Sequence, residues 1–269
     1  MGTLCKMILV TSKSCRTWVS DNCHFMIKKI VFTLLGLLVI LVVLILVQSV
    51  DPVQIDPKKT VSVVPENINP EELSLDSLWE VVGDKKTVPK GFEKAALVAY
   101  SAYPQLKEVN IEMVLTQSGA PMESNFDLKT LFGSGENRVY RVLLNNAQDS
   151  GFEPILLRNL PFDAQVGILA HELGHVAYYH QLTTLQIAKW GVLYVASSDF
   201  RAKHERSTDL MPLYHGLGHQ IYHYAWYVRN DPSCKPLYEQ FGSFIDKYYL
   251  TDTEIKDAME NHALYQNVK

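Results

Sequence analysis

The sequence predicts an α+β domain over residues 91–269, on the basis of two observations. Short apolar segments typical of strands occur early in this region, at residues 110–116, 138–144 and 154–158. A helix is expected just before them, at residues 92–103, and after Pro161 the spacing of apolar residues becomes helical almost to the end of the chain. Strands that are followed by a run of helices, and do not alternate with them, are typical of α+β folds.

The composition is that of an ordinary globular protein. Of the 269 residues, 47% are hydrophobic and 20% are charged, which leaves room for one sizeable domain and argues against disorder. The formal net charge is -4 and no long basic block occurs, so no nucleic-acid partner is expected.

Residues 30–47 form a run of 18 residues without a charged side chain. A helix of this length crosses most of a hydrocarbon core of about 30 Å, so we expect one transmembrane helix. Residues 1–29 should lie on the cytoplasmic side, because positive flanks such as Lys28 and Lys29 resist translocation, and the C-terminal domain then lies on the outer side. A cleavable signal peptide is the alternative, although its apolar run is usually about 7 to 15 residues long and residues 47–51 lack a clear small-x-small cleavage site.

The segments on either side of the apolar run have different characters. Residues 1–25 show little periodicity, so we hypothesise that the native chain begins at Met26. Residues 48–90 are rich in proline and charged residues, which predicts a spacer with one short helix near residues 75–82. Because Cys234 is the one cysteine after the apolar run, we expect no disulfide within the outer domain.

The stretch His171-Glu172-Leu173-Gly174-His175 carries most of the chemical information. Apolar residues recur around it at spacings of 3, 4 and 3, which predicts one buried helix face made of Val166, Leu169, Leu173 and Val176. His171 and His175 project together onto the opposite face, since they lie one turn apart. Two such imidazoles can ligate one Zn²⁺, while Glu172 acts as general base toward a zinc-activated water. A surface helix with two solvated histidines is the alternative.

A second motif, Glu205-Arg206-Ser207-Thr208-Asp209, begins thirty residues after His175. A catalytic zinc ion needs three protein ligands and one open position. Glu205 and Asp209 share one helical face, so Glu205 can bind the metal while Asp209 accepts the second N–H of a ligand histidine. Taken alone the motif is weak, and a solvated charged face is the alternative. The N-cap candidates for this helix are Ser197, Ser198 and Asp199.

Together the two motifs resemble the gluzincin pattern, H-E-x-x-H followed by E-x-x-x-D. The sequence LAHELGHVAYYH at residues 169–180 is similar to the family of membrane-associated peptidases that includes HtpX and the CAAX prenyl protease, with their small soluble relatives. The resemblance covers residues 154–210 and implies a zincin-like fold with an edge strand just before the active-site helix, here at residues 154–158. Metzincins fit less well, because their third histidine would fall on Gln181. The later helices carry too many polar residues for a multi-pass membrane core, so intramembrane cleavage is not expected.

The expected function is a membrane-anchored metalloendopeptidase with one Zn²⁺ per chain, held by His171, His175 and Glu205. Glu172 would take a proton from the zinc-activated water and hand it to the leaving amine. The edge strand would bind a polypeptide substrate by β-augmentation. Two alternatives stay open, a catalytically inactive zincin-fold binding protein at the membrane surface and a structural zinc protein. If Glu205 is not the third ligand, the next candidates are His204 and His180.

A further group of histidines follows the second motif. Pro212 can start a new helix, because its missing N–H falls in the first turn. Apolar spacing then predicts a core stripe of Leu213, Leu217, Ile221, Tyr224 and Val228, with the opposite face lined by His215, His219 and His223. His223, with Tyr222 or Tyr224 nearby, is the candidate donor to the oxyanion, and His262 is the candidate outside this helix. A structural role for all three histidines, or a second zinc at His215 and His219, is the alternative.

Overall fold

The computed structural model describes residues 29–45, 62–131, 137–147 and 151–266. Its internal contacts divide the chain into two units, Met1–Ser49 and Val50–Lys269. In the first unit residues 29–45 form a helix whose apolar side chains are exposed. None of the helices within the described ranges is both long and apolar enough to cross a membrane. Residues 1–28 and 46–61 lie outside the described part of the chain, and with them the hypothesis on residues 1–25, the end of the expected transmembrane helix and the start of the spacer.

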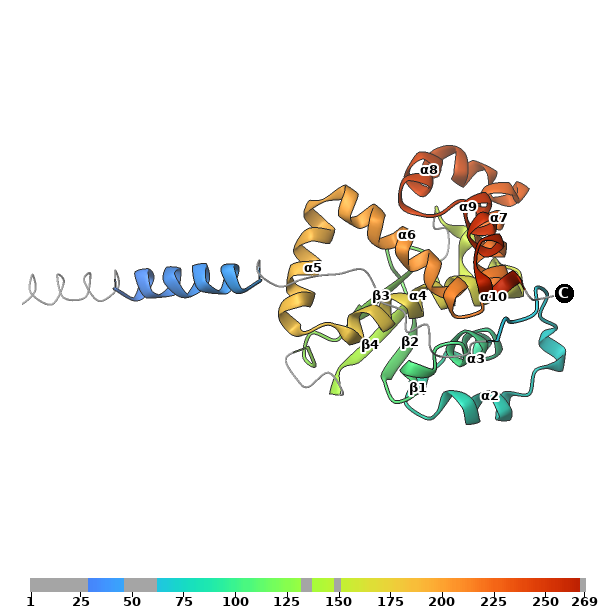
Figure 1. Ribbon diagram of the computed structural model, residues 1–269, viewed down its shortest axis with the longest axis horizontal. Helices are drawn as coiled ribbons and strands as arrows, with labels where there is room; N and C mark the ends of the chain where they lie inside the picture. The colour runs from blue at the N-terminus through green and yellow to red at the C-terminus, as the bar shows by residue number, and fades with distance from the viewer. Residues whose placement is uncertain (1–28, 46–61, 132–136, 148–150, 267–269) are drawn as a thin grey trace, which may run out of the picture. The chain divides into compact units, whose positions relative to one another are not determined.

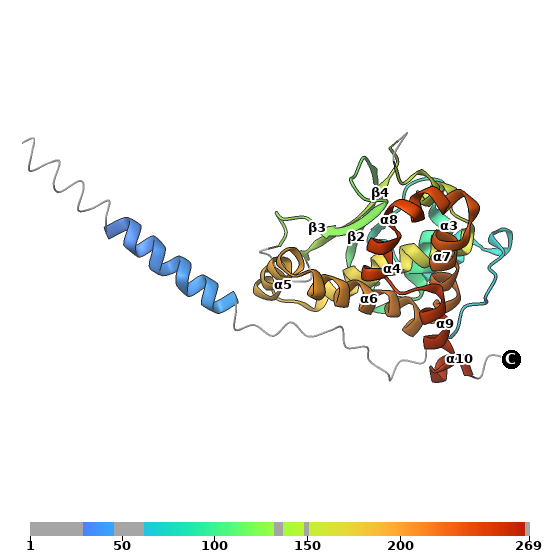
Figure 2. The ribbon, with the colours of Figure 1, turned by 90° about the horizontal axis from the view of Figure 1, so that it is seen from above.

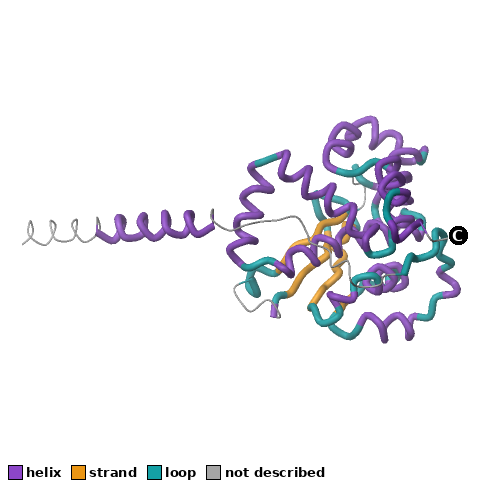
Figure 3. The backbone as a smooth tube through the Cα atoms, viewed as in Figure 1, coloured by secondary structure: helices purple, strands orange, loops and turns teal. Residues whose placement is uncertain are grey.

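The second unit combines one small sheet with many helices, so the predicted α+β class is confirmed. Figure 3 shows the strands gathered together with helices around them. The sheet has the order β1 (Lys86–Thr87), β2 (Asn110–Thr116), β4 (Val139–Asn145) and β3 (Met122–Phe126). β1, β2 and β4 run parallel to one another, whereas β3 pairs with β4 in antiparallel orientation, for example Ser124 opposite Val142. β3 therefore forms one edge of the sheet.

Two of the three predicted strands are confirmed. β2 has the predicted bounds, and β4 begins one residue later than the predicted segment 138–144. The buried side chains alternate along β4, at Tyr140, Val142 and Leu144, and along the first part of β2, at Ile111 and Met113.

The third predicted strand, at residues 154–158, is wrong. The chain there makes two short 3-10 turns, Glu153–Ile155 and Leu157–Asn159. Pro154 cannot donate to a strand ladder, and the Glu153 carboxylate closes the turn by accepting hydrogen bonds from the side chains of Arg158 and Asn159. The edge strand is β3 instead, and it escaped prediction because Met122 alone of its five side chains is buried.

The described residues of this unit also form nine α-helices, joined by loops and short 3-10 turns. Figure 1 labels them α2 (Leu75–Val82), α3 (Glu93–Ser101), α4 (Phe162–Gln181), α5 (Thr184–Ala196), α6 (Ser198–Tyr214), α7 (Gly218–Asn230), α8 (Lys235–Tyr248), α9 (Asp252–Glu260) and α10 (Ala263–Gln266). α2 confirms the short helix expected near residues 75–82, and α3 lies within the segment expected to be helical at residues 92–103. Ser197 caps α6 by accepting a hydrogen bond from the Phe200 N–H, as one of the predicted N-cap candidates.

α4 is the central element of the domain. It packs against α3, α6 and α7 and against the sheet through β3, and Figure 2 shows it enclosed between the strands and the other helices. Its apolar residues Val166, Leu169, Leu173 and Val176 are completely buried, as the spacing predicts. Gly167 lets α7 approach closely, because a Cβ atom there would lie only 2.2 Å from the Gln220 carbonyl oxygen. The side chains of α4 consequently face neighbours on all sides.

The prediction that Pro212 starts a new helix is wrong. Pro212 lies inside α6, which continues for two more residues, and α7 begins only at Gly218. Gly216 makes the connection with a φ of 82°, a conformation that glycine adopts without strain. The predicted stripe is buried at Leu213, Leu217, Ile221 and Val228 and partly buried at Tyr224, but it spans two helices. Of the histidines that were expected to share one helix face, His219 and His223 lie one turn apart on α7, whereas His215 is the C-cap residue of α6.

Candidate metal centre

Two helices bring together the side chains of the two sequence motifs. α4 carries His171 and His175 one turn apart, and α6 packs across α4 and carries Glu205. All three side chains are buried, with relative exposures of 3%, 6% and 3%. The alternative of a solvated histidine pair therefore does not hold.

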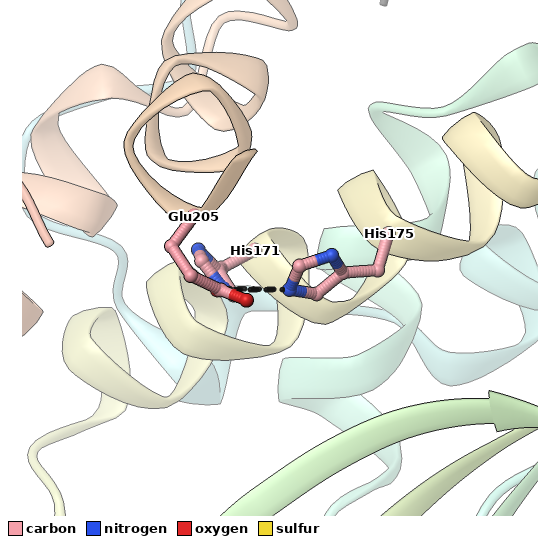
Figure 4. A group of neighbouring side chains, drawn as sticks. All are labelled: His171, His175 and Glu205. Carbon is pink, nitrogen blue, oxygen red and sulfur yellow. Dashed lines mark hydrogen bonds and ion pairs between the residues drawn. The ribbon is translucent and has the colours of Figure 1, made fainter. Parts of the chain in front are cut away.

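The donor atoms of these side chains face one another at short distances (Figure 4). The Nε2 atoms of His171 and His175 are 3.1 Å apart, and the Oε2 atom of Glu205 lies 3.5 and 3.3 Å from them. Donors bound to a tetrahedral zinc ion at about 2.1 Å lie about 3.4 Å from one another. The three atoms thus have the spacing that one such ion requires, and the group could hold a metal ion.

Each imidazole of the group contacts a second side chain through its other ring nitrogen. The Nδ1 atom of His171 lies 2.8 Å from Oδ1 of Asp209, and the Nδ1 atom of His175 lies 3.2 Å from Nε2 of His204. The charge of Asp209 favours a proton on Nδ1 of His171, although this contact lacks hydrogen-bond geometry, and His204 can accept a proton from Nδ1 of His175. With the protons on Nδ1, both Nε2 lone pairs face the common point. The second oxygen of Glu205 accepts a hydrogen bond from the Tyr194 hydroxyl at 2.5 Å.

The buried histidines and carboxylates of this group shift one another's pKa values. Burial lowers the pKa of His171, but its contacts with Asp209 and Glu205 outweigh burial and hold the pKa well above its usual range. Burial raises the pKa of Glu205, but the neighbouring His175 and His171 outweigh it and hold the pKa well below its usual range. Burial, with the nearby His175, lowers the pKa of His204 to about 3, so His204 stays neutral and can accept the His175 proton. The carboxylates therefore favour a cation between the two imidazoles, whether a proton or a metal ion.

A cavity of about 380 Å³ opens beside this group. His171, Glu172 and Asp209 contribute to its wall, and most of the other lining residues are apolar. The Glu172 side chain is buried, yet its Oε2 atom has no hydrogen-bond partner among the described residues. The Glu172 carbonyl accepts a hydrogen bond from the Ser124 hydroxyl at 3.0 Å, which joins this turn of α4 to the edge strand β3.

Two tyrosines line the cavity, whereas the sequence predicted His223 as the donor to the oxyanion. Tyr249 and Tyr224 line the cavity, whereas His223 is not among its lining residues. The ring of Tyr249 lies 5.9 Å from that of His171, and burial together with the Glu205 carboxylate raises the pKa of the Tyr249 hydroxyl. The backbone N–H of Leu250 donates to Oδ2 of Asp209 at 2.7 Å, which holds this segment beside the metal group. No local pattern in the sequence distinguishes Tyr249 from the other 13 tyrosines of the chain.

The remaining histidine candidates lie in other surroundings. His215 is buried with its ring stacked on Tyr103 and its Nδ1 atom 2.8 Å from the Met211 carbonyl oxygen, and His219 packs edge-on against Tyr265. His262 accepts the Leu264 N–H, and His180 lies 3.4 Å from the Tyr140 hydroxyl. Among the described residues, the metal-binding arrangement found is that of His171, His175 and Glu205, so the second zinc considered for His215 and His219 gains no support.

Comparisons of the chain with protein families, with curated proteins and with solved structures found no match.

Proposed function

We propose that this chain is a zinc-dependent metalloendopeptidase whose single zinc ion is held by His171, His175 and Glu205. Two histidines and one glutamate form a ligand set typical of catalytic zinc, because it leaves a fourth position open for the reaction. The two imidazole nitrogens among the three donors support zinc over ions that prefer six or more oxygen ligands. Zinc in this position would act as a Lewis acid toward the scissile carbonyl and toward the attacking water.

The observation that carries the proposal is the buried, unpartnered Oε2 atom of Glu172 in the wall of the cavity shared with His171. A buried acceptor without a partner is uncommon in folded proteins and often marks a chemical role. Glu172 would accept the proton of the attacking water and transfer it to the leaving amine. The raised pKa of Tyr249 keeps its hydroxyl protonated. This hydroxyl would donate a hydrogen bond to the oxyanion that forms.

The edge strand β3 provides a place for the substrate backbone. β3 pairs with β4 along one edge only, and Ser124 links its centre to the Glu172 turn of α4. A peptide in extended conformation could add to the free edge as a further strand, with its main chain running past Glu172. Such binding recognises the backbone of a polypeptide and fits an endopeptidase.

The test is the substitution Glu172→Gln, which removes the base but none of the three metal ligands. The purified variant should bind one zinc per chain, measured by inductively coupled plasma mass spectrometry, and lose hydrolysis of unfolded casein. Glu239→Gln, on the exposed surface of α8, is the matched control and should retain activity. Casein hydrolysis by Glu172→Gln at the wild-type rate would refute the proposal, and a wild-type protein that binds zinc without hydrolysis would favour an inactive binding protein.

We also propose that residues 30–47 anchor the chain in a membrane with the metallopeptidase domain on the outer side, as the charges at Lys28 and Lys29 indicate. Cys234 is fully buried and a poor reporter of topology, so the exposed Ser243 is the better position. In the variant Ser243→Cys, a membrane-impermeant maleimide should label the domain in intact cells. Labelling of residue 243 only after permeabilisation would reverse the orientation.

A further inference from the structure

The cavity beside Glu172 is larger and more apolar than hydrolysis itself requires. A volume of about 380 Å³ lies within the range of pockets that enclose whole ligand groups. Several parts of the fold supply its apolar wall, among them α4 with Ile168, α7 with Ala225 and Val228, the start of β3 with Met122, and α8. The cavity therefore extends from the metal group to elements that carry no catalytic residue.

α8 contributes an apolar face that stays open toward the cavity. The helix is amphipathic, and its apolar side chains Leu237, Phe241, Phe244 and Ile245 line the cavity without closing it. Phe244 remains 51% exposed. An apolar cavity that stays empty lowers stability, and an exposed apolar surface at its mouth is typical of a binding site.

One charged side chain in the wall offers a hydrogen bond to an occupant. The Arg229 side chain is only 7% exposed, and its Nε atom lies 3.0 Å from the Asp246 carboxylate. Its Nη2 atom has no hydrogen-bond partner among the described residues. Because Asp246 already balances the charge, the free N–H suits a neutral carbonyl oxygen better than a second carboxylate side chain.

We propose that this cavity receives a bulky apolar side chain of the substrate, such as leucine, methionine or phenylalanine, at a position next to the scissile bond. The inference rests on the proposed peptidase function. Ala120, Pro121 and Met122 lead into β3 and line the cavity, so a peptide bound along β3 passes over its mouth. Successive side chains of an extended peptide point to opposite sides, and the one beside Glu172 enters the cavity. The Arg229 Nη2 group donates to a carbonyl oxygen of the same peptide.

The first experiment maps cleavage sites in unfolded casein by mass spectrometry. A bulky apolar residue should flank the cut on one constant side. In synthetic peptides built on such a site, replacing this residue by alanine should lower kcat/KM by about 10- to 100-fold, and replacing it by glutamate should lower it further. Equal cleavage of the alanine and parent peptides, or preference for the glutamate peptide, would overturn the inference while leaving the peptidase function intact.

Substitution of the wall provides a second test. Phe244→Ala removes an apolar group at the mouth and should reduce the preference for the parent peptide over the alanine peptide at least several-fold. Trp226→Ala, an exposed aromatic residue on α7 outside the cavity, is the matched control and should not change it. Both side chains are partly exposed, so folding should survive in either variant. Unchanged selectivity in Phe244→Ala would contradict the inference.

Binding can be measured without turnover. The zinc-loaded Glu172→Gln variant should bind a fluorescein-labelled parent peptide about tenfold or more tightly than the alanine peptide, as followed by fluorescence anisotropy. Ala225→Leu, which partly fills the cavity from α7, should remove this difference. Equal affinity for both peptides would overturn the pocket assignment. If the parent peptide binds preferentially but wild-type protein never cleaves it, the pocket stands and the peptidase proposal fails.

Discussion

The close packing of α4 against α7 makes Gly167→Ala the most informative single substitution for the architecture that holds the site. A Cβ atom at residue 167 would lie 2.2 Å from the Gln220 carbonyl oxygen and 2.5 Å from its carbonyl carbon. Carbon and oxygen atoms ordinarily approach to about 3.3 Å, so α7 would have to move away by about 1 Å. The obstacle is backbone, which cannot rotate aside as a long side chain can.

The magnitude follows from two opposing effects. Replacing glycine by alanine inside a helix usually stabilises by about 0.5–1 kcal/mol, because the unfolded chain loses freedom. Overpacking a close contact usually costs about 1–3 kcal/mol and sometimes more. The backbone clash at residue 167 should place the loss at the upper end, for a net destabilisation of about 2 kcal/mol or more. Zinc affinity should fall as well, because Gly167 lies one turn before His171.

Urea unfolding of the metal-free proteins, followed by circular dichroism, measures the stability of three glycine-to-alanine variants. Gly191→Ala in α5 is the matched control, since no atom lies within 4 Å of its Cβ, and it should be neutral or slightly stabilising. Gly174→Ala, whose Cβ would lie 3.0 Å from Met211 and 3.1 Å from Thr208, should fall between the two. If Gly167→Ala unfolds at the wild-type urea concentration with an unchanged slope, the described packing of α4 and α7 is wrong.

Three further predictions concern the metal centre. Glu205→Ala leaves two protein ligands, so zinc should be lost to a mild chelator that leaves the wild type loaded, and equal zinc retention would point to another third ligand. Tyr249→Phe removes the proposed oxyanion donor, so it should lower kcat about a hundred-fold with little change in KM, whereas His223→Ala should leave kcat unchanged. A loss of kcat in His223→Ala and none in Tyr249→Phe would instead identify His223 as the oxyanion donor. Because the folded pKa of His171 is raised, the metal-free protein should lose stability as the pH rises above about 6.5 through that raised pKa, and urea midpoints that increase over this range would contradict the assignment.

Local patterns in the sequence account for the parts of the fold that repeat regularly. The spacing of Leu169, Leu173 and Val176 identified α4, and short apolar segments identified β2 and β4. β3 gave no such signal, because one face of it carries polar side chains and just one of its residues is buried. The segment at residues 154–158 is apolar for a different reason, since Ile155, Leu156 and Leu157 are buried in turns. Composition alone could not separate these cases.

The candidate site shows the same limit. His171 and His175 form a pair through helical spacing, which one helix determines by itself. The position of Glu205 depends on how α6 crosses α4, and sequence reasoning reached it through resemblance to a known pattern. Tyr194 on α5 and Tyr249 at the end of α8 meet the group only through tertiary packing, so their place in the site could not be predicted. His204 was named as an alternative ligand, and the structure places it beside His175 instead. His223 lies on α7 as expected, but it is not among the residues that line the cavity.

The glycine between the two histidine ligands connects the local motif to this tertiary arrangement. A Cβ at Gly174 would press on Met211 and Thr208 of α6 at 3.0 and 3.1 Å, so α6 lies closer to α4 than a larger residue would allow without a shift. That approach brings the Glu205 carboxylate within 3.5 Å of both imidazoles, and it also brings Asp209 to the Nδ1 atom of His171. A larger residue at position 174 would separate the helices and lengthen all of these distances together. The helix that carries two of the three candidate ligands therefore also carries the contact that lets the third one approach.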